Sequence, residues 1–153
     1  MKTGFVVRNL APSQLSYYLI NSINGEMENS CTDEAVVFIQ EPSIKMKANN
    51  FSMLNSTEMW SFSGSLISTD ISTTRQLSSL FGISKKFFYV WDLLWCRPQW
   101  RNHELTIKAF TDPSIRLIAR SEDHAKMIKN YCNRDVCGIV DDFNMEQLKE
   151  VIS

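Results

Sequence analysis

The chain has 153 residues, of which 44% are hydrophobic and 22% charged, and this composition excludes a disordered or fibrous protein. Its formal charge of -1 excludes the strong positive field expected of a general nucleic-acid-binding protein or of a protein attracted to anionic membranes. We expect a single domain over residues 1–153, with a core large enough to need no disulfide or metal.

The N-terminal part predicts two strands with a helix between them. Apolar runs at residues 3–8 and 35–40 favour strands, and the second lacks polar alternation, so it should be buried on both faces. From Leu15 to Ile23, apolar residues recur at helical spacing, and Gly25 is expected to end this helix. The polar residues 26–33 are then expected to form a loop.

The next segment alternates weak and clear patterns. Residues 41–56 have no regular pattern and are expected to form a loop over one edge of a site. Residues 59–69 predict one strand, or two short strands with a bend at Gly64. Asp70 and Ser72 are the candidate N-caps for a following helix, which should include Phe81 and end at Gly82.

Residues 85–97, KKFFYVWDLLWCR, contain the most apolar run of the chain. They predict a central strand that ends near Asp92, at the rim of a site. An aromatic loop and a short helix bearing Leu105 and Phe110 are expected to follow.

The C-terminal part predicts two further strand and helix pairs. Residues 115–119 and 137–140 favour short strands. Ser121 is the expected N-cap of a helix that turns Ile128 inward, and Asn144 is the expected start of the last helix.

Alternating strands and helices with apolar strands predict an α/β fold: a single Rossmann-like, doubly wound, mostly parallel sheet with helices on both faces. Right-handed crossovers would place the carboxyl ends of the strands at one edge, where ligands bind in such folds. The residues expected at this edge are Arg8, Asn9, Gln40, Glu41, Thr69, Asp70, Trp91, Asp92, Arg120, Ser121, Glu122, Asp141 and Asp142.

The chemistry at this edge favours binding over a recognisable catalytic centre. The glycine fingerprints of dinucleotide and P-loop sites are absent. For Asp92 the residue type favours a helix or turn cap, and the alternative is a general base or hydroxyl-binding carboxylate. Ser121 is expected to be a helix cap and not a nucleophile. The candidate ligand-binding residues are Asn9, Asp70, Trp91, Asp92, Ser121 and Glu122.

Aromatic and cationic side chains cluster around Asp92. Trp91, Trp95 and Trp100, beside Arg97, are suited to stack on a sugar or a base. The same residues also suit an aromatic cover on the sheet or a protein interface. The candidate interface residues are Leu94, Trp95, Arg97 and Trp100.

The four cysteines, Cys31, Cys96, Cys132 and Cys137, have no zinc-site spacing. We expect buried reduced thiols, no metal, no cofactor and a cytoplasmic location. No apolar run approaches the length of a membrane span.

Three segments resemble the latter part of the N-terminal, acceptor-side half of GT-B-fold glycosyltransferases. They are GSLISTDISTTRQLSSLFG, KKFFYVWDLLW and IRLIARSEDHAKMIKNYCNRDVCGIVDDFNMEQL, and together they extend over about half of the chain, from Gly64 to Leu148. The resemblance implies that Ser121 and Glu122 open the last helix of that half, and that residues 141–144 lead toward the interdomain linker.

The sequence also departs from that pattern. Residues 9–13 replace the glycine-rich loop usual after the first strand, and the donor-binding half of the family has no counterpart in this sequence. We therefore expect a binding module, or one component of a two-chain glycosyltransferase that does not transfer sugar by itself. The alternatives are a protein-interaction domain, possible as a homodimer, and a small-ligand or nucleotide-binding domain.

Overall fold

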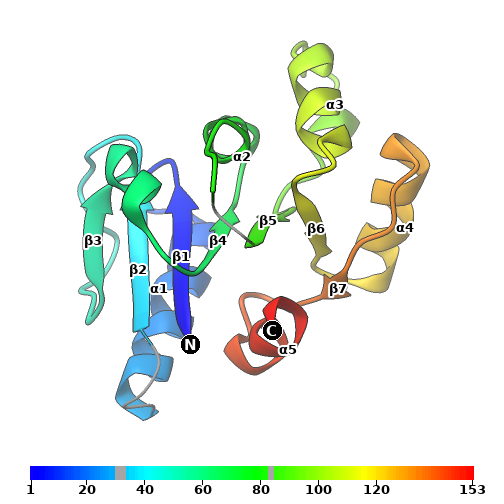
Figure 1. The fold of residues 1–153 in the computed structure, drawn as a ribbon. Coiled ribbons are helices and arrows are strands. Elements are labelled where there is room, and N and C mark those ends of the chain that lie inside the picture. Colours follow the sequence, from blue (N-terminus) through cyan, green and yellow to red (C-terminus); the bar gives the residue numbers. More distant parts are fainter. Residues whose placement is uncertain (30–33, 83–84) are drawn as a thin grey trace.

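The computed structural model describes residues 1–29, 34–82 and 85–153. These residues form a seven-stranded sheet in the order β3-β2-β1-β4-β5-β6-β7, with every pair of neighbours parallel (Figure 1). The strands are β1 (Lys2–Val7), β2 (Glu34–Ile39), β3 (Ser52–Asn55), β4 (Ser65–Ser68), β5 (Lys85–Tyr89), β6 (Arg116–Ala119) and β7 (Gly138–Ile139). This arrangement confirms the predicted Rossmann-like, doubly wound fold.

Helices cover both faces of the sheet. The helices α1 (Gln14–Asn29) and α5 (Met145–Ile152) pack on one core cluster, which includes Phe5 and Tyr89. The other face carries the helices α2 (Ile71–Ser78), α3 (His103–Thr111) and α4 (Glu122–Cys132). Two short 3-10 helices, η1 (Ser56–Ser61) and η2 (Leu94–Cys96), complete the described elements.

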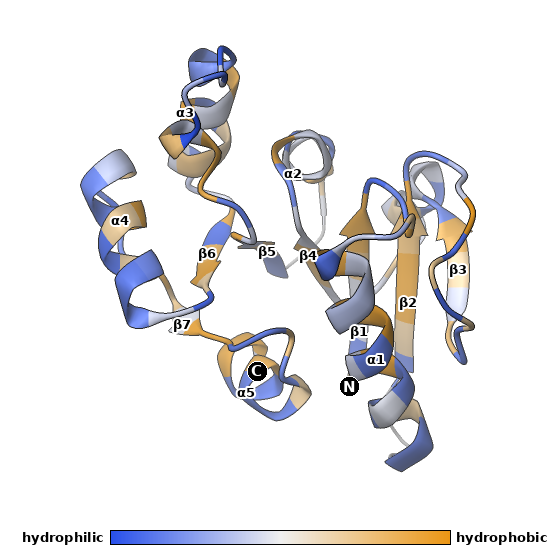
Figure 2. Cartoon of the chain, turned by 180° about the vertical axis from the view of Figure 1, so that it is seen from behind, coloured by the Kyte–Doolittle hydropathy of each residue, from blue (hydrophilic) through white to orange (hydrophobic). Residues whose placement is uncertain are grey.

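The apolar strands face a core on each side. In β5, Phe87 and Tyr89 point into the cluster under α1 and α5, whereas Phe88 points into the cluster under α2, α3 and α4. Figure 2 shows β1 and β2 as mainly hydrophobic, while the helices mix hydrophobic and hydrophilic residues. This double burial explains why the central strands have no alternating polar pattern.

Three predicted helix caps are confirmed. The Asp70 carboxylate accepts a hydrogen bond from Thr73 N at 2.8 Å, and the Ser121 hydroxyl accepts one from His124 N at 3.2 Å. The Asn144 side chain accepts bonds from the first turn of α5. These caps were predictable because each depends only on residues within one helical turn.

The prediction of an unstructured loop over residues 41–56 is wrong, because β3 lies within it. β3 is an edge strand that pairs only with β2, and its side chains are mostly exposed. Backbone hydrogen bonds to β2 stabilise β3, so its sequence has no apolar pattern that predicts a strand. The strand predicted to begin at residue 59 starts only at Ser65, and η1 precedes it.

Two helix ends also differ from prediction. α1 continues through Gly25 to Asn29, so residues 26–29 are helical and not a loop. A glycine inside a helix costs roughly 1 kcal/mol, and contacts made after it offset this cost. Lys149 of α5 donates to the Glu26 carboxylate, and Met27 packs against the core. α2 stops at Ser78, which leaves Phe81 outside the helix and 95% exposed.

Two further sequence-based expectations concern thiols and membranes. Cys96, Cys132 and Cys137 are free thiols; Cys132 is buried, whereas Cys96 and Cys137 are exposed, which corrects the expectation of burial for these two. Cys96 ends η2 and Cys137 directly precedes β7, so neither lies in a central strand. Cys31 lies outside the described residues. Within the ranges that the structure describes, no helix combines the length and apolarity needed to cross a bilayer.

Candidate functional site

A cleft of about 570 Å³ lies at the point where the strand order reverses. The sheet extends from β1 through β2 to β3 on one side and from β4 to β7 on the other, so the carboxyl ends of β1 and β4 form a crevice. The volume is within the range of small-molecule sites. Its lining comes from the residue after β1, the start of α1, residues 69–72 after β4, and the segment 91–100 after β5.

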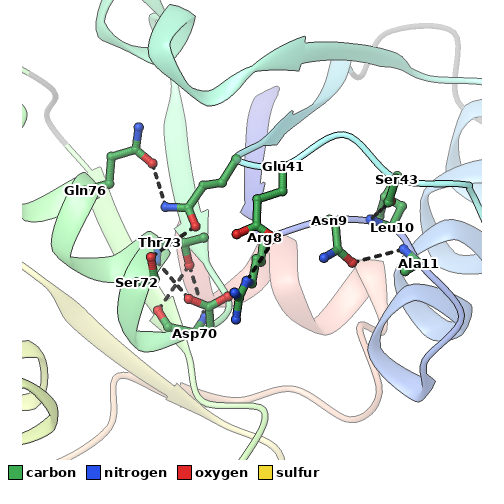
Figure 3. A network of polar contacts seen from close by, with 11 residues as sticks. Arg8, Asn9, Leu10, Ala11, Glu41, Ser43, Asp70, Ser72, Thr73 and Gln76 are labelled. Atoms are coloured by element: carbon green, nitrogen blue, oxygen red, sulfur yellow. Dashed lines mark hydrogen bonds and ion pairs between the residues drawn. The ribbon is translucent and has the colours of Figure 1, made fainter. Parts of the chain in front are cut away.

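Each of the two arginines that line the cleft is paired with a carboxylate. Arg8 Nε donates to Glu41 Oε2 at 3.2 Å, as Figure 3 shows, and Arg97 lies 3.2 Å from Asp92 Oδ1. The hydrogen bond and the charge of Glu41 raise the pKa of Arg8, and the charge of Asp70 adds to this effect. The cleft thus presents two cations, each beside a carboxylate.

Two tryptophans border the cleft, and both are held by other side chains. Trp91 is only 7% exposed, and the guanidinium of Arg120 lies 3.7 Å from the centre of its ring. Trp100 Nε1 donates to Thr106 Oγ1 at 2.8 Å. Fixed aromatic rings beside polar groups are typical of small-molecule sites, because they orient a ligand without loss of their own freedom.

A strained turn at Asp142 and Phe143 packs against Trp91. Asp142 and Phe143 have φ angles of 38° and 60°, a left-handed conformation that costs of order 1–3 kcal/mol for such residues. Asp142 accepts a hydrogen bond from Arg120 at 2.5 Å, and the Phe143 ring stacks on Trp91 at 5.4 Å. The turn therefore fixes both the ring and the guanidinium that contact Trp91.

The Tyr89 hydroxyl holds this turn in place. It donates to Val140 O at 2.8 Å and accepts from Phe143 N at 3.4 Å. Burial of the hydroxyl raises the pKa of Tyr89 to about 12. The neutral phenol is therefore favoured in the folded chain.

Replacing Tyr89 by Phe is expected to lower the free energy of unfolding by about 1–3 kcal/mol, because two buried backbone groups lose their partner. Since the folded pKa exceeds the ordinary value of about 10, this stabilisation is complete below pH 10 and falls as the pH rises toward 12. Urea denaturation at neutral and alkaline pH measures both effects. A stability difference between the two proteins that does not shrink over this range would contradict the assignment.

His124 lies beside the same cluster. Its Nδ1 is buried and has no hydrogen-bond partner in the described part of the chain. Burial lowers the pKa of His124, the charge of Arg120 lowers it further, and the charge of Asp92 opposes both. The neutral imidazole is thus favoured, and it does not line the cleft.

The cleft brings together some of the predicted site residues but not all. Asp70, Trp91 and Asp92 line it, together with the predicted interface residues Leu94, Arg97 and Trp100. Asn9, Ser121 and Glu122 do not line it: Asn9 accepts from Ala11 N, Ser121 caps α4, and Glu122 is exposed. Trp95 stacks on Tyr131 with ring centres 4.1 Å apart.

Several lining residues had no signal strong enough to select them as site residues. Arg8 and Thr69 directly follow β1 and β4, so their positions at the strand ends were predicted, but their meeting in one cleft depends on strand order. Ser13 was predicted only as part of the loop after the first strand, and Leu15 only as part of the first helix. Once the strand order is known, such residues can be identified as the polar residues that directly follow adjacent parallel strands.

No metal site accompanies the cleft in the part of the chain that the structure describes. Within it, no three histidine, cysteine, aspartate or glutamate side chains are grouped as metal ligands would be. Asp70 and Asp92 are the two carboxylates that line the cleft, and a carboxylate can accept hydrogen bonds from a ligand.

Comparisons with known proteins give no family for the chain. Nothing matches it among protein-family models, curated proteins or solved structures. The functional interpretation therefore depends on the position, shape and chemistry of the cleft.

Proposed function

We propose that the chain binds a carbohydrate-containing small molecule in the switch-point cleft, as the acceptor-side domain of a glycosyltransferase-like protein. The main observation in support is that Trp91, Trp100 and Asp92 border one cleft of small-molecule size. The resemblance of residues 64–148 to the acceptor-side half of GT-B-fold enzymes adds support for the class of protein.

The chemistry of the lining suits a sugar. The Trp100 ring offers an apolar surface to the C–H face of a pyranose, and carboxylates accept hydrogen bonds from its hydroxyls. Trp91, which is only 7% exposed and contacts Arg120 and Phe143, forms part of the wall. Asp92 is the candidate general base for an acceptor hydroxyl, because it is a carboxylate at the cleft held by Arg97. A partner domain or chain would supply the activated sugar.

Replacing Trp100 by Ala is expected to weaken binding of the best carbohydrate in a panel by about tenfold or more, a loss of roughly 1.4 kcal/mol. The reason is that the ring borders the cleft and is held there by Thr106. Calorimetric titration measures the affinity, and circular dichroism checks the fold. Asp92→Asn keeps the shape of the side chain and should also weaken binding.

Trp60→Ala is the matched control. Trp60 lies on η1, is 73% exposed and does not line the cleft, so its removal should leave the affinity unchanged. Binding that is equally sensitive to both tryptophan substitutions would place the ligand elsewhere. A panel in which no carbohydrate binds the wild-type chain would contradict the proposal itself.

The alternative of a protein-interaction surface has less support. Trp95 packs against Tyr131 and also meets Phe110 edge-on at 5.0 Å, which makes it part of the cover over α3 and α4. Leu94, Arg97 and Trp100 border the cleft. The residues once grouped as an interface thus divide between a packed cover and the proposed site.

A further inference from the structure

Two backbone amides in the loop between β1 and α1 are already bonded within the chain. In nucleotide-binding folds of this topology, a phosphate lies at the amino end of the helix that follows the first strand. Here Leu10 N donates to Ser43 Oγ at 3.3 Å and Ala11 N donates to Asn9 Oδ1 at 3.1 Å (Figure 3). In the first turn of α1, Ser16 N donates to Ser13 Oγ at 3.1 Å. A phosphate bound through these three amides would have to displace their side-chain acceptors.

The start of α2, on the other side of the crevice, is also capped by side chains and is therefore less available to a phosphate. Asp70 Oδ1 accepts from Thr73 N at 2.8 Å, and Thr73 Oγ1 accepts from Asp70 N at 3.1 Å, so the two residues cap the helix reciprocally. Asp70 also brings a negative charge to the place where a phosphate would lie. Like charges at close range repel, and the penalty grows in a partly enclosed site.

The two arginines of the cleft do not offer a free anion site. Arg8 is bonded to Glu41 and Arg97 is paired with Asp92, so a phosphate would have to compete with a carboxylate for either one. A hydroxyl has no such competition. Asp70 Oδ2 has no hydrogen bond with any residue that the structure describes and remains available as an acceptor.

From these contacts we infer that the cleft selects an uncharged, hydroxyl-bearing ligand over a phosphorylated one, and that Asp70 is the residue that sets this preference. The ligand class is an unphosphorylated glycoside, as distinct from a sugar phosphate or a nucleotide. This inference rests on the proposed function and names the ligand of the same site.

The test compares affinities for methyl glycosides with those for the corresponding sugar phosphates and for UMP. The wild-type chain is expected to bind at least one methyl glycoside about tenfold or more tightly than its phosphorylated counterpart. Asp70→Ser should reduce the ratio of glycoside affinity to sugar-phosphate affinity by about tenfold, because serine preserves the helix cap and removes the charge. Asp70→Asn, which keeps the size of the side chain, should change the ratio in the same direction.

Asp135→Ser is the charge-matched control. Asp135 is 78% exposed, pairs with Lys129 and does not line the cleft, so its substitution should leave the ratio unchanged. A wild-type chain that binds a sugar phosphate or UMP at least as tightly, and loses it in Trp100→Ala, would overturn the inference while the cleft remains a binding site. An unchanged ratio in both Asp70 variants would overturn the role of Asp70. Absence of binding by every probe would remove the proposed function and this inference together.

Discussion

Replacing Phe143 by Ala is expected to lower the free energy of unfolding by about 3–5 kcal/mol. The ring is fully buried and lies 4.5 Å from the Tyr89 ring and 6.3 Å from the Phe5 ring, so its removal opens a cavity between β1, β5 and the turn before α5. The strained φ angle of the turn remains in the variant, so nothing offsets the lost packing. Guanidinium denaturation measures the change.

Phe81→Ala removes the same ring from an exposed position and is expected to change stability by no more than about 0.5 kcal/mol. Comparable losses in the two variants would mean that the ring at Phe143 is not packed as described. Phe143→Ala should also weaken ligand binding at the cleft under conditions where it is folded, because Trp91 loses its stacking partner. The two readouts separate the role of the ring in stability from its role in positioning Trp91.

The central architecture was predictable because its signals are local and strong. The run from Phe87 to Val90 is buried on both sides of the sheet, so every residue of the strand is apolar. The caps Asp70 and Ser121 act within a single helical turn. Such patterns can be recognised in the sequence without knowing which other strands and helices the segment packs against.

The missed elements depend on distant partners. β3 exists because its backbone pairs with β2, and α1 continues past Gly25 because Glu26 meets Lys149, 123 residues away. Neither interaction leaves a periodic signal in the local sequence. Tertiary contacts thus decided the ends of these elements, where intrinsic propensity predicted a stop.

The candidate site was predictable in its parts and not in its assembly. Parallel strands alone place Asp70, Asp92 and Ser121 at the same edge of the sheet. The strand order then decides which of them meet: β1 lies beside β4, so Arg8 and Asp70 share a cleft, while Ser121 lies after β6 and away from it. Strand order is a long-range property that the sequence pattern did not contain.

Replacing Arg134 by Met is expected to destabilise the chain by about 2–4 kcal/mol, although the residue lies far from the cleft along the sequence. Its guanidinium donates to three backbone carbonyls near the end of α3 and the start of β6, those of Phe110 at 2.7 Å, Asp112 at 2.8 Å and Ile115 at 2.7 Å. Methionine keeps much of the side-chain volume but leaves all three acceptors without this donor. Thermal and urea denaturation measure the loss.

Arg134→Lys tests whether the forked geometry matters. A single ammonium cannot reach three carbonyls arranged around a planar guanidinium, so lysine should recover only part of the stability. Arg101→Met, at an exposed position, is the control and should have little effect. If lysine restored full stability, charge alone would explain the contribution. A loss that remains in the lysine variant would show that the planar guanidinium joins α3 to β6 and thereby fixes the strand that precedes Arg120.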